Sequence, residues 1–224
     1  MVSVMDAPMR PPLIRKSPVD LPSTANSATF SWALISRELG ESSDGTINIA
    51  HLAVDRHARS TRAEKTAFRF LGADGSTRNV SYRELAGLTD RFGNTLKSLD
   101  VQKGDRVFVL CGRICELYVA VLGALKIGAV VSPLFQSFGP EPIRSRIAQA
   151  AGKVLVTTAS AYQRKVAALR AELPSLRHVL LIDDLGAGTI ADTLDLHTLL
   201  RAAPETPALV PTGVGLLLSR LHNR

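Results

Sequence analysis

The sequence contains few cysteines and no long apolar run. Its two cysteines, Cys111 and Cys115, are spaced C-x3-C, which is neither a redox C-x-x-C motif nor half of a zinc site. The five histidines are scattered without metal-ligand spacing, so we predict no metal site. No apolar run approaches the roughly 20 residues of a membrane span, and residues 1–18 lack the apolar core of a secretory signal. We therefore expect a cytoplasmic protein, no membrane partner, and two buried thiols.

Aromatic residues are also scarce, at 5% of the chain. The net charge of +7 permits an anionic partner, but no basic block alternates with aromatic side chains as in nucleic-acid-binding surfaces. We therefore predict no nucleic-acid partner and interpret the charge as a solvated surface.

Residues 104–158 alternate between the patterns of strands and helices. The apolar run 106–111, bounded by Gly-Asp and Gly-Arg, is typical of a strand buried on both faces of a parallel sheet. Residues 129–134 and 153–158 predict two further strands. The helix after the first strand is expected to end at Gly128 and to bury one stripe of residues: Ile114, Leu117, Tyr118, Val121, Leu122 and Leu125. The next helix begins near Pro142 and turns Ile143, Ile147 and Ala151 inward.

The flanking segments extend this α/β pattern. Asn48 is predicted to cap a helix that begins at Ile49, and residues 65–82 read as a hairpin around Ala-Asp-Gly. Ser81 and Glu84 form a capping box for a helix whose inner face is Leu85, Leu88, Phe92, Leu96 and Leu99. After the third strand we predict a helix ending near Leu173, a fourth strand at 178–183 and a weak helix at 193–203.

In order and spacing, these pieces resemble the N-terminal part of the AMP-forming acyl-CoA synthetases, above all the acetyl-CoA synthetases. The matching stretches include NIAHLAVDRH, SYRELAGLTDRFGNTLKSL, KGDRVFV, ELYVAVLGALKIGAVVSPLFQSFGPEPIRSRI, KVLVTT and LRHVLLIDD. The resemblance implies an α/β fold, a partial N-terminal domain of an adenylate-forming ligase with a mainly parallel, helix-flanked sheet, an N-terminal helical leader and a hairpin. We divide the chain into a disordered, proline-rich leader at 1–28, the partial domain at 29–203 and an atypical tail at 204–224. A short helix at 29–39 carries Trp32, which is expected to pack the leader onto the body.

The resemblance also implies a reaction: a short carboxylic acid and ATP form an acyl-adenylate, and the acyl group then passes to coenzyme A. The cofactors so implied are ATP, magnesium and coenzyme A. Phe135, Gln136 and Ser137, in a loop between strand and helix, are carried over as coenzyme A contacts, as is Arg164. The family's second arginine falls at position 167, which is alanine here, so Lys165 is the substitute. The alternative interpretation is that Arg164 and Lys165 are solvated residues on a helix surface.

No nucleotide phosphate loop is recognisable. The family motif T-S-G-T-T-G-x-P-K-G does not occur in the sequence. Residues 123–129 have G-x-x-x-x-G spacing but lack the following Lys and Ser or Thr, and residues 186–191 match G-x-G-x-x-A without a second βαβ unit after them. The last residues, PALVPTGVGLLLSRLHNR, are unlike the family and typical of a truncation or reading-frame change. We therefore assign no catalytic residue and expect the chain alone not to be catalytic.

Three functions stay open at this point. The first is the N-terminal part of an acetate/acyl–CoA ligase. The second is a non-catalytic module that binds coenzyme A or a protein and is complemented in trans by another chain, and the third is a dinucleotide enzyme that uses Gly186. With four predicted strands, one sheet edge is expected to stay open, which predicts self-association and marginal stability.

Overall fold

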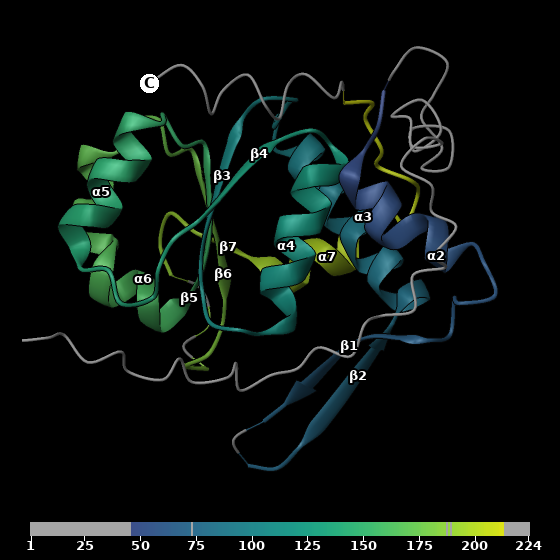
Figure 1. Cartoon of the computed structure of the whole chain (residues 1–224). Helices are drawn as coiled ribbons and strands as arrows, with labels where there is room; N and C mark the ends of the chain where they lie inside the picture. The colour runs from purple at the N-terminus through teal and green to yellow at the C-terminus, as the bar shows by residue number, and fades with distance from the viewer. Residues whose placement is uncertain (1–45, 73, 187, 189, 213–224) are drawn as a thin grey trace, which may run out of the picture. The chain divides into compact units, whose positions relative to one another are not determined.

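A parallel sheet of five strands, in the order β4-β3-β5-β6-β7, forms the centre of the structure (Figure 1). This computed structural model describes residues 46–72, 74–186, 188 and 190–212. The predicted leader, the helix with Trp32 and residues 213–224 of the predicted tail lie outside the described residues. All neighbouring strands pair in parallel. The strands are β3 (Arg106–Leu110), β4 (Val130–Pro133), β5 (Val154–Thr158), β6 (His178–Ile182) and β7 (Leu194–Asp195).

Helices cover both faces of this sheet, and each face has its own core. Along β3, Val107 and Val109 belong to the core under α3, α4 and α7, whereas Phe108 and Leu110 belong to the core under α5 and α6. Successive strand residues point to opposite faces, so an uninterrupted apolar strand supplies both cores. The helices are α3 (Tyr82–Ser98), α4 (Cys115–Lys126), α5 (Pro140–Gln149), α6 (Ala159–Lys165) with the following 3-10 helix η3 (Ala167–Glu172), and α7 (Leu196–Ala202).

The structure confirms the predicted α/β class and the four predicted strands, and it adds the short strand β7. The predicted helix up to Leu173 is broken at Val166, where α6 ends and η3 follows. Ile143 and Ile147 are fully buried as predicted, but the prediction for Ala151 was wrong. Ala151 is exposed and has a φ of 48°, so it lies in the left-handed turn beyond α5.

The inner face of α4 also differs from the prediction. Its buried residues are Cys115, Val119, Ala120, Gly123, Ala124 and Lys126, whereas the predicted stripe is only partly buried. The α4 helix is covered by α3 on one side and by the sheet on another, so apolar residues surround it and a single stripe does not identify its inner face. Small residues allow the close approach: a Cβ at Gly123 would lie 2.7 Å from the carbonyl oxygen of Thr89, and one at Gly93 would lie 3.3 Å from the carbonyl oxygen of Gly123.

The predicted hairpin is present and projects beyond α3 and α4, at the lower right of Figure 1. Strands β1 (Thr66–Leu71) and β2 (Thr77–Ser81) are antiparallel, and Gly75 in their turn has a φ of 81°. Phe68 packs on Tyr118 of α4 with ring centroids 4.5 Å apart. At the end of β2, the Ser81 side chain accepts a hydrogen bond from Glu84 N at 3.2 Å, which confirms the predicted cap of α3.

The helix at 49–58 begins at the predicted cap. Asn48 Oδ1 accepts hydrogen bonds from Ala50 N at 3.0 Å and His51 N at 3.2 Å. Within this helix a π-helical turn, η2 (His51–Asp55), precedes α2 (Arg56–Ala58) and brings Asp55 into the interior.

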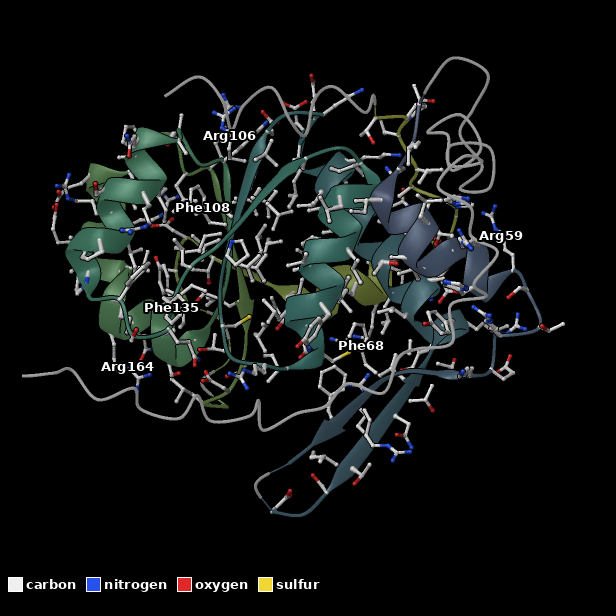
Figure 2. All side chains as sticks on the ribbon, viewed as in Figure 1. Arg59, Phe68, Arg106, Phe108, Phe135 and Arg164 are labelled. Atoms are coloured by element: carbon white, nitrogen blue, oxygen red, sulfur yellow. The ribbon has the colours of Figure 1, made fainter. Side chains whose placement is uncertain are left out.

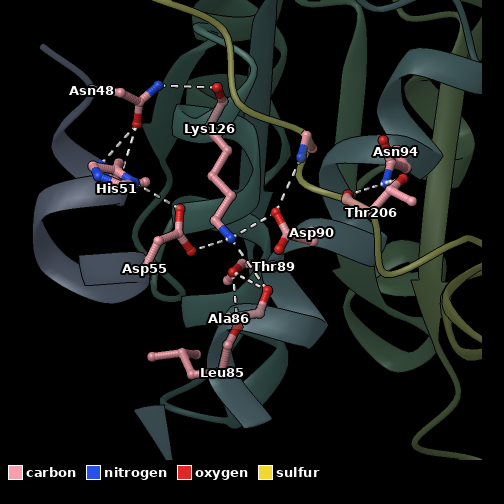
Figure 3. Close-up of polar contacts among 12 residues, drawn as sticks. Asn48, His51, Asp55, Leu85, Ala86, Thr89, Asp90, Asn94, Lys126 and Thr206 are labelled. Carbon is pink, nitrogen blue, oxygen red and sulfur yellow. Dashed lines mark hydrogen bonds and ion pairs between the residues drawn. The ribbon is translucent and has the colours of Figure 1, made fainter. Parts of the chain in front are cut away.

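A buried ion cluster joins this helix to α3 and α4 (Figure 3). The Nζ atom of Lys126 is fully buried and lies 2.6 Å from Asp55 Oδ1 and 2.8 Å from Asp90 Oδ1. It also donates a hydrogen bond to the carbonyl oxygen of Ala86 at 3.2 Å. The three elements are thereby tied by charge as well as by apolar contact.

The described part of the predicted tail, residues 204–212, packs against the same helices. Asn94 donates hydrogen bonds to the carbonyl oxygens of Pro204 at 3.0 Å and Thr206 at 2.8 Å. Ala208 is fully buried, and its N–H donates to Asp90 Oδ1 at 3.1 Å. At the end of the segment, Ile47 N donates to the carbonyl oxygen of Thr212 at 2.8 Å.

Candidate functional site

A cleft of about 590 Å³ lies at the carboxyl ends of β3, β5 and β6. In a parallel sheet these ends meet at one edge, and the loops that follow them form the usual ligand site of open α/β folds. The polar side chains that line the cleft are Glu116, Gln136, Thr158, Ser160, Arg164, Lys165 and Asp184.

A second cleft of about 560 Å³ adjoins the first and shares Gly112 and Gln136 with it. Its lining is mainly apolar and includes Leu117 and Phe135. The side chain of Gln136 extends from the 134–139 loop to Gly112 at the end of β3, where a Cβ would lie 3.3 Å from Gln136 Nε2. Gln136 therefore lies in the wall between the two clefts.

The five residues predicted from the sequence line these two clefts. Gln136, Arg164 and Lys165 line the first, and Phe135, Gln136 and Ser137 line the second. Phe135 is 71% exposed, which leaves its ring open to a ligand. Figure 2 shows Phe135 and Arg164 near the same end of the sheet.

Arg164 and Lys165 have different surroundings. Arg164 is exposed, and within the described part of the chain it forms no ion pair or hydrogen bond. Lys165 is partly buried and donates a hydrogen bond to the carbonyl oxygen of Gln136. Arg164 is thus available to an anion, whereas Lys165 ties α6 to the 134–139 loop.

Two carboxylates in the first cleft were not predicted from the sequence. Glu116, at the start of α4, lies 3.1 Å from Nε2 of His197. Asp184 follows β6 and accepts a hydrogen bond from the N–H of Ser160 at 2.9 Å. Partial burial alone would raise the pKa of Asp184, but the hydrogen bonds from Ser160 outweigh it and hold this pKa below its usual value. The position of Asp184 directly after a predicted strand was the signal that could have identified it.

The two thiols near the site are buried, as predicted. Cys111 lines the second cleft but is only 8% exposed, and burial, with a smaller contribution from Glu116, raises its pKa to about 12. Burial also raises the pKa of Cys115. The part of the chain that the structure describes contains no cluster of His, Cys, Asp and Glu that could hold a metal ion.

Neither glycine motif forms a phosphate cradle. Gly123 is buried in the contact between α3 and α4, so its backbone is closed to a ligand. After β6, the carboxylate of Asp183 accepts hydrogen bonds from Leu185 N at 3.0 Å and Gly188 N at 3.3 Å, and β7 follows before the next helix begins at Leu196. The described residues therefore do not fit the triphosphate of ATP, and they do not fit a dinucleotide fingerprint, whose glycines open directly into a helix.

Comparison with protein families and curated relatives gives a consistent result. The family model described as AMP-binding enzyme matches residues 54–211. An acetyl-coenzyme A synthetase of Methanothrix thermoacetophila is 42% identical over 121 residues, which are 54% of this chain and 18% of the relative. That of Bacillus subtilis is 36% identical over 154 residues, which are 68% of this chain and 26% of the relative. The chain thus spans only a minor part of the length of these relatives.

Solved structures show the same similarity. A Brucella canis acyl-CoA synthetase superposes with a TM-score of 0.73 at 27% identity, over 83% of this chain and 33% of that one. An acetoacetyl-CoA synthetase from Streptomyces lividans gives a TM-score of 0.69 at 30% identity, over 75% of this chain and 27% of that one. In the described residues, no helix is long and apolar enough to cross a membrane.

Proposed function

Since this chain belongs to the AMP-binding enzyme family, as its sequence predicted, we propose that it forms the coenzyme A-binding part of an acid–CoA ligase. In that reaction a short carboxylic acid and ATP give an acyl-adenylate, and coenzyme A accepts the acyl group. The observation that carries the proposal is the cleft at the carboxyl ends of β3, β5 and β6, which brings Gln136, Arg164 and Lys165 together.

Each of these residues has a distinct role in the proposed site. The free guanidinium of Arg164 binds a phosphate of coenzyme A, for which its planar fork of N–H donors is suited. Lys165 holds the 134–139 loop through its hydrogen bond to Gln136. Phe135 offers an exposed ring against which the adenine can stack, beside Gln136 and Ser137 in the second cleft.

Titration calorimetry with coenzyme A and dephospho-coenzyme A tests this proposal. We expect the 224-residue chain to bind coenzyme A, and Arg164→Ala to weaken binding by about 10-fold or more, since a hydrogen bond to a charged group contributes roughly 1.5–3 kcal/mol. A smaller loss for dephospho-coenzyme A would place Arg164 at the 3′-phosphate, and an equal loss would place it at the pyrophosphate.

Arg59→Ala is the matched control. Arg59 is also an exposed arginine, but it follows α2 on the opposite side of the view in Figure 2. Equal affinities for wild type, Arg59→Ala and Arg164→Ala, or no binding by the wild type, would refute the proposed site.

We do not assign the adenylation step to these residues, because the described glycine motifs do not fit the phosphates of ATP. We expect no pyrophosphate release when the purified chain is given ATP, magnesium and acetate. Release above the background of a heat-treated sample would contradict this part of the proposal.

A second candidate is a non-catalytic module that binds coenzyme A and is complemented in trans. It is favoured by the first cleft, because the residues that line it all lie between positions 110 and 184 of this chain. If this candidate holds, adding a separately expressed polypeptide with a phosphate loop restores acyl-CoA formation. If activity requires both parts in one chain, the ligase interpretation holds instead.

Self-association through an open sheet edge is also a proposal. Strand β4 is at the edge of the sheet, and its Val130 is 37% exposed. Unpaired strand edges are templates for pairing with another chain. Sedimentation velocity at increasing concentration tests this, and a monomer at all concentrations would exclude it.

A further inference from the structure

We propose that the Glu116–His197 pair sets the anion affinity of the first cleft, so that Glu116 weakens phosphate binding and a protonated His197 restores it. This inference rests on the proposed coenzyme A site and adds to it a residue that determines specificity. If the inference holds, protonation of His197 strengthens binding of the phosphate ligand, and binding of the ligand favours protonation of His197.

The charges that line the cleft cancel when His197 is neutral. Among the described residues, the cations of the lining are Arg164 and Lys165, and its carboxylates are Glu116 and Asp184. Because all four charged groups line one cleft, each of them acts on a ligand bound in it, most strongly at ionic strengths of 0.1 M or below. Phosphate of coenzyme A therefore meets repulsion from the carboxylates as well as attraction to Arg164.

The two carboxylates differ in their hydrogen-bond partners. Asp184 is held by fixed hydrogen bonds from the backbone N–H and hydroxyl of Ser160, which do not change with pH near neutrality. Glu116 faces a titratable group instead: Nε2 of His197 lies 3.1 Å from its Oε1. The side chain of Glu116 is 19% exposed and that of His197 is 44% exposed, so the pair is partly shielded from water but open to protons. Protonation of His197 compensates the charge of Glu116 and leaves the cleft with a net positive charge.

His197 has other charged neighbours, among them Asp195, with which it interacts electrostatically. On its own element, Asp195 is engaged by Thr198 N, and Arg201 binds the Thr198 hydroxyl at 2.9 Å. From α3, Arg91 donates to carbonyl oxygens at the end of α7, for example that of Ala203 at 2.9 Å.

The thiols beside Glu116 stay uncharged. The pKa values of Cys111 and Cys115 are both raised by burial. Cys111 and Cys115 therefore add no negative charge beside Glu116 near neutral pH.

The test is calorimetric titration of coenzyme A at pH 6 and pH 8 into wild type, Glu116→Gln and His197→Gln. At pH 8 we expect Glu116→Gln to bind coenzyme A about two- to fivefold more tightly, the factor that corresponds to a partly exposed charge interaction of about 0.4–1 kcal/mol. The 3′-phosphate itself titrates near pH 6, so the diagnostic quantity is the ratio of the wild-type affinity to that of His197→Gln. We expect this ratio to be larger at pH 6 than at pH 8.

The possible outcomes separate this inference from the proposed function. If Arg164→Ala binds coenzyme A as the wild type does, the coenzyme A site itself is wrong. If Arg164→Ala weakens binding but folded Glu116→Gln, checked by its melting curve, shows no gain, this inference alone fails. An affinity ratio that is equal at the two pH values also overturns it. Inorganic phosphate as a second probe should show the same order of variants.

Discussion

The ammonium group of Lys126 lies 2.6 Å from the carboxylate of Asp55, and both side chains are inside the protein. Lys126 ends α4, and Asp55 comes from the π-helical turn at 51–55. With Asp90 at 2.8 Å on the other side, the cluster has two carboxylates for one ammonium. Its members pack three segments that are distant in the sequence.

Replacing Lys126 by Met is expected to destabilise the protein by about 3–5 kcal/mol, because two buried carboxylates then lose their cation. Urea unfolding at pH 7 measures this. The variant that combines Lys126→Met with Asp55→Asn and Asp90→Asn is the control and should recover much of the loss. A single Lys126→Met variant as stable as the wild type would show that the cluster is not energetically important.

Two helical glycines are expected to respond in opposite directions to alanine. Gly123→Ala places a Cβ 2.7 Å from the backbone oxygen of Thr89 and should destabilise by about 1–3 kcal/mol. Gly87→Ala brings its Cβ to within 3.3 Å of only the flexible end of Glu205 and should stabilise by up to about 1 kcal/mol through helix propensity. The urea unfolding midpoints of the two variants, compared with that of the wild type, measure these effects. Similar effects of the two changes would contradict the close contact between α3 and α4.

Asp105 is expected to make stability depend on pH in the acidic range. Partial burial would raise the pKa of this carboxyl, but Lys153 at 2.8 Å and the N–H of Gln102 outweigh it and lower the pKa. A carboxyl with a lowered folded-state pKa contributes stability above its unfolded value of about 3.9, and this is lost as the pH falls through the folded pKa.

Urea unfolding of wild type and Asp105→Asn between pH 7 and pH 3 tests this. The difference between the two should be largest at pH 7 and shrink toward pH 3. A constant difference would mean that the charge of Asp105 has no role.

The two cysteines are expected to resist thiol reagents. Burial raises the pKa of Cys111 to about 12 and raises that of Cys115, and a buried thiol has little thiolate at pH 8. Ellman's reagent should label neither residue in the folded protein and both in urea. Rapid stoichiometric labelling without denaturant would contradict the packing described around β3 and α4.

Much of the fold could be predicted because the strands are continuous apolar runs bounded by glycine and charged residues. The hairpin, the N-cap of α3 at Ser81 and the strands β3 to β6 depend on local sequence patterns. They were predicted correctly. The buried position of Lys126 was not, since its partners Asp55 and Asp90 are distant in the sequence and a lysine is ordinarily a surface residue. Strand β7 has only two residues, too few to show a period.

The residues that line the two clefts were predictable in part. The 134–139 loop and Arg164 were identified by resemblance, and the structure places them around adjoining clefts. Glu116 and His197 were not, because one begins α4 and the other begins α7, and their contact exists only once both helices pack on the same face of the sheet.

The pairing of Ile47 with Thr212 closes the path of the described chain on itself. The N–H of Ile47 and the hydroxyl of Thr212 each donate to a carbonyl oxygen of the other residue. A shortened polypeptide of residues 46–212 would therefore have adjacent ends and could be circularly permuted, with these ends joined by a short linker and new termini made in the β1–β2 turn. In such a permutant the connection between residues 47 and 212 would become covalent, and the hairpin that now projects as one piece would be split between the two ends of the chain.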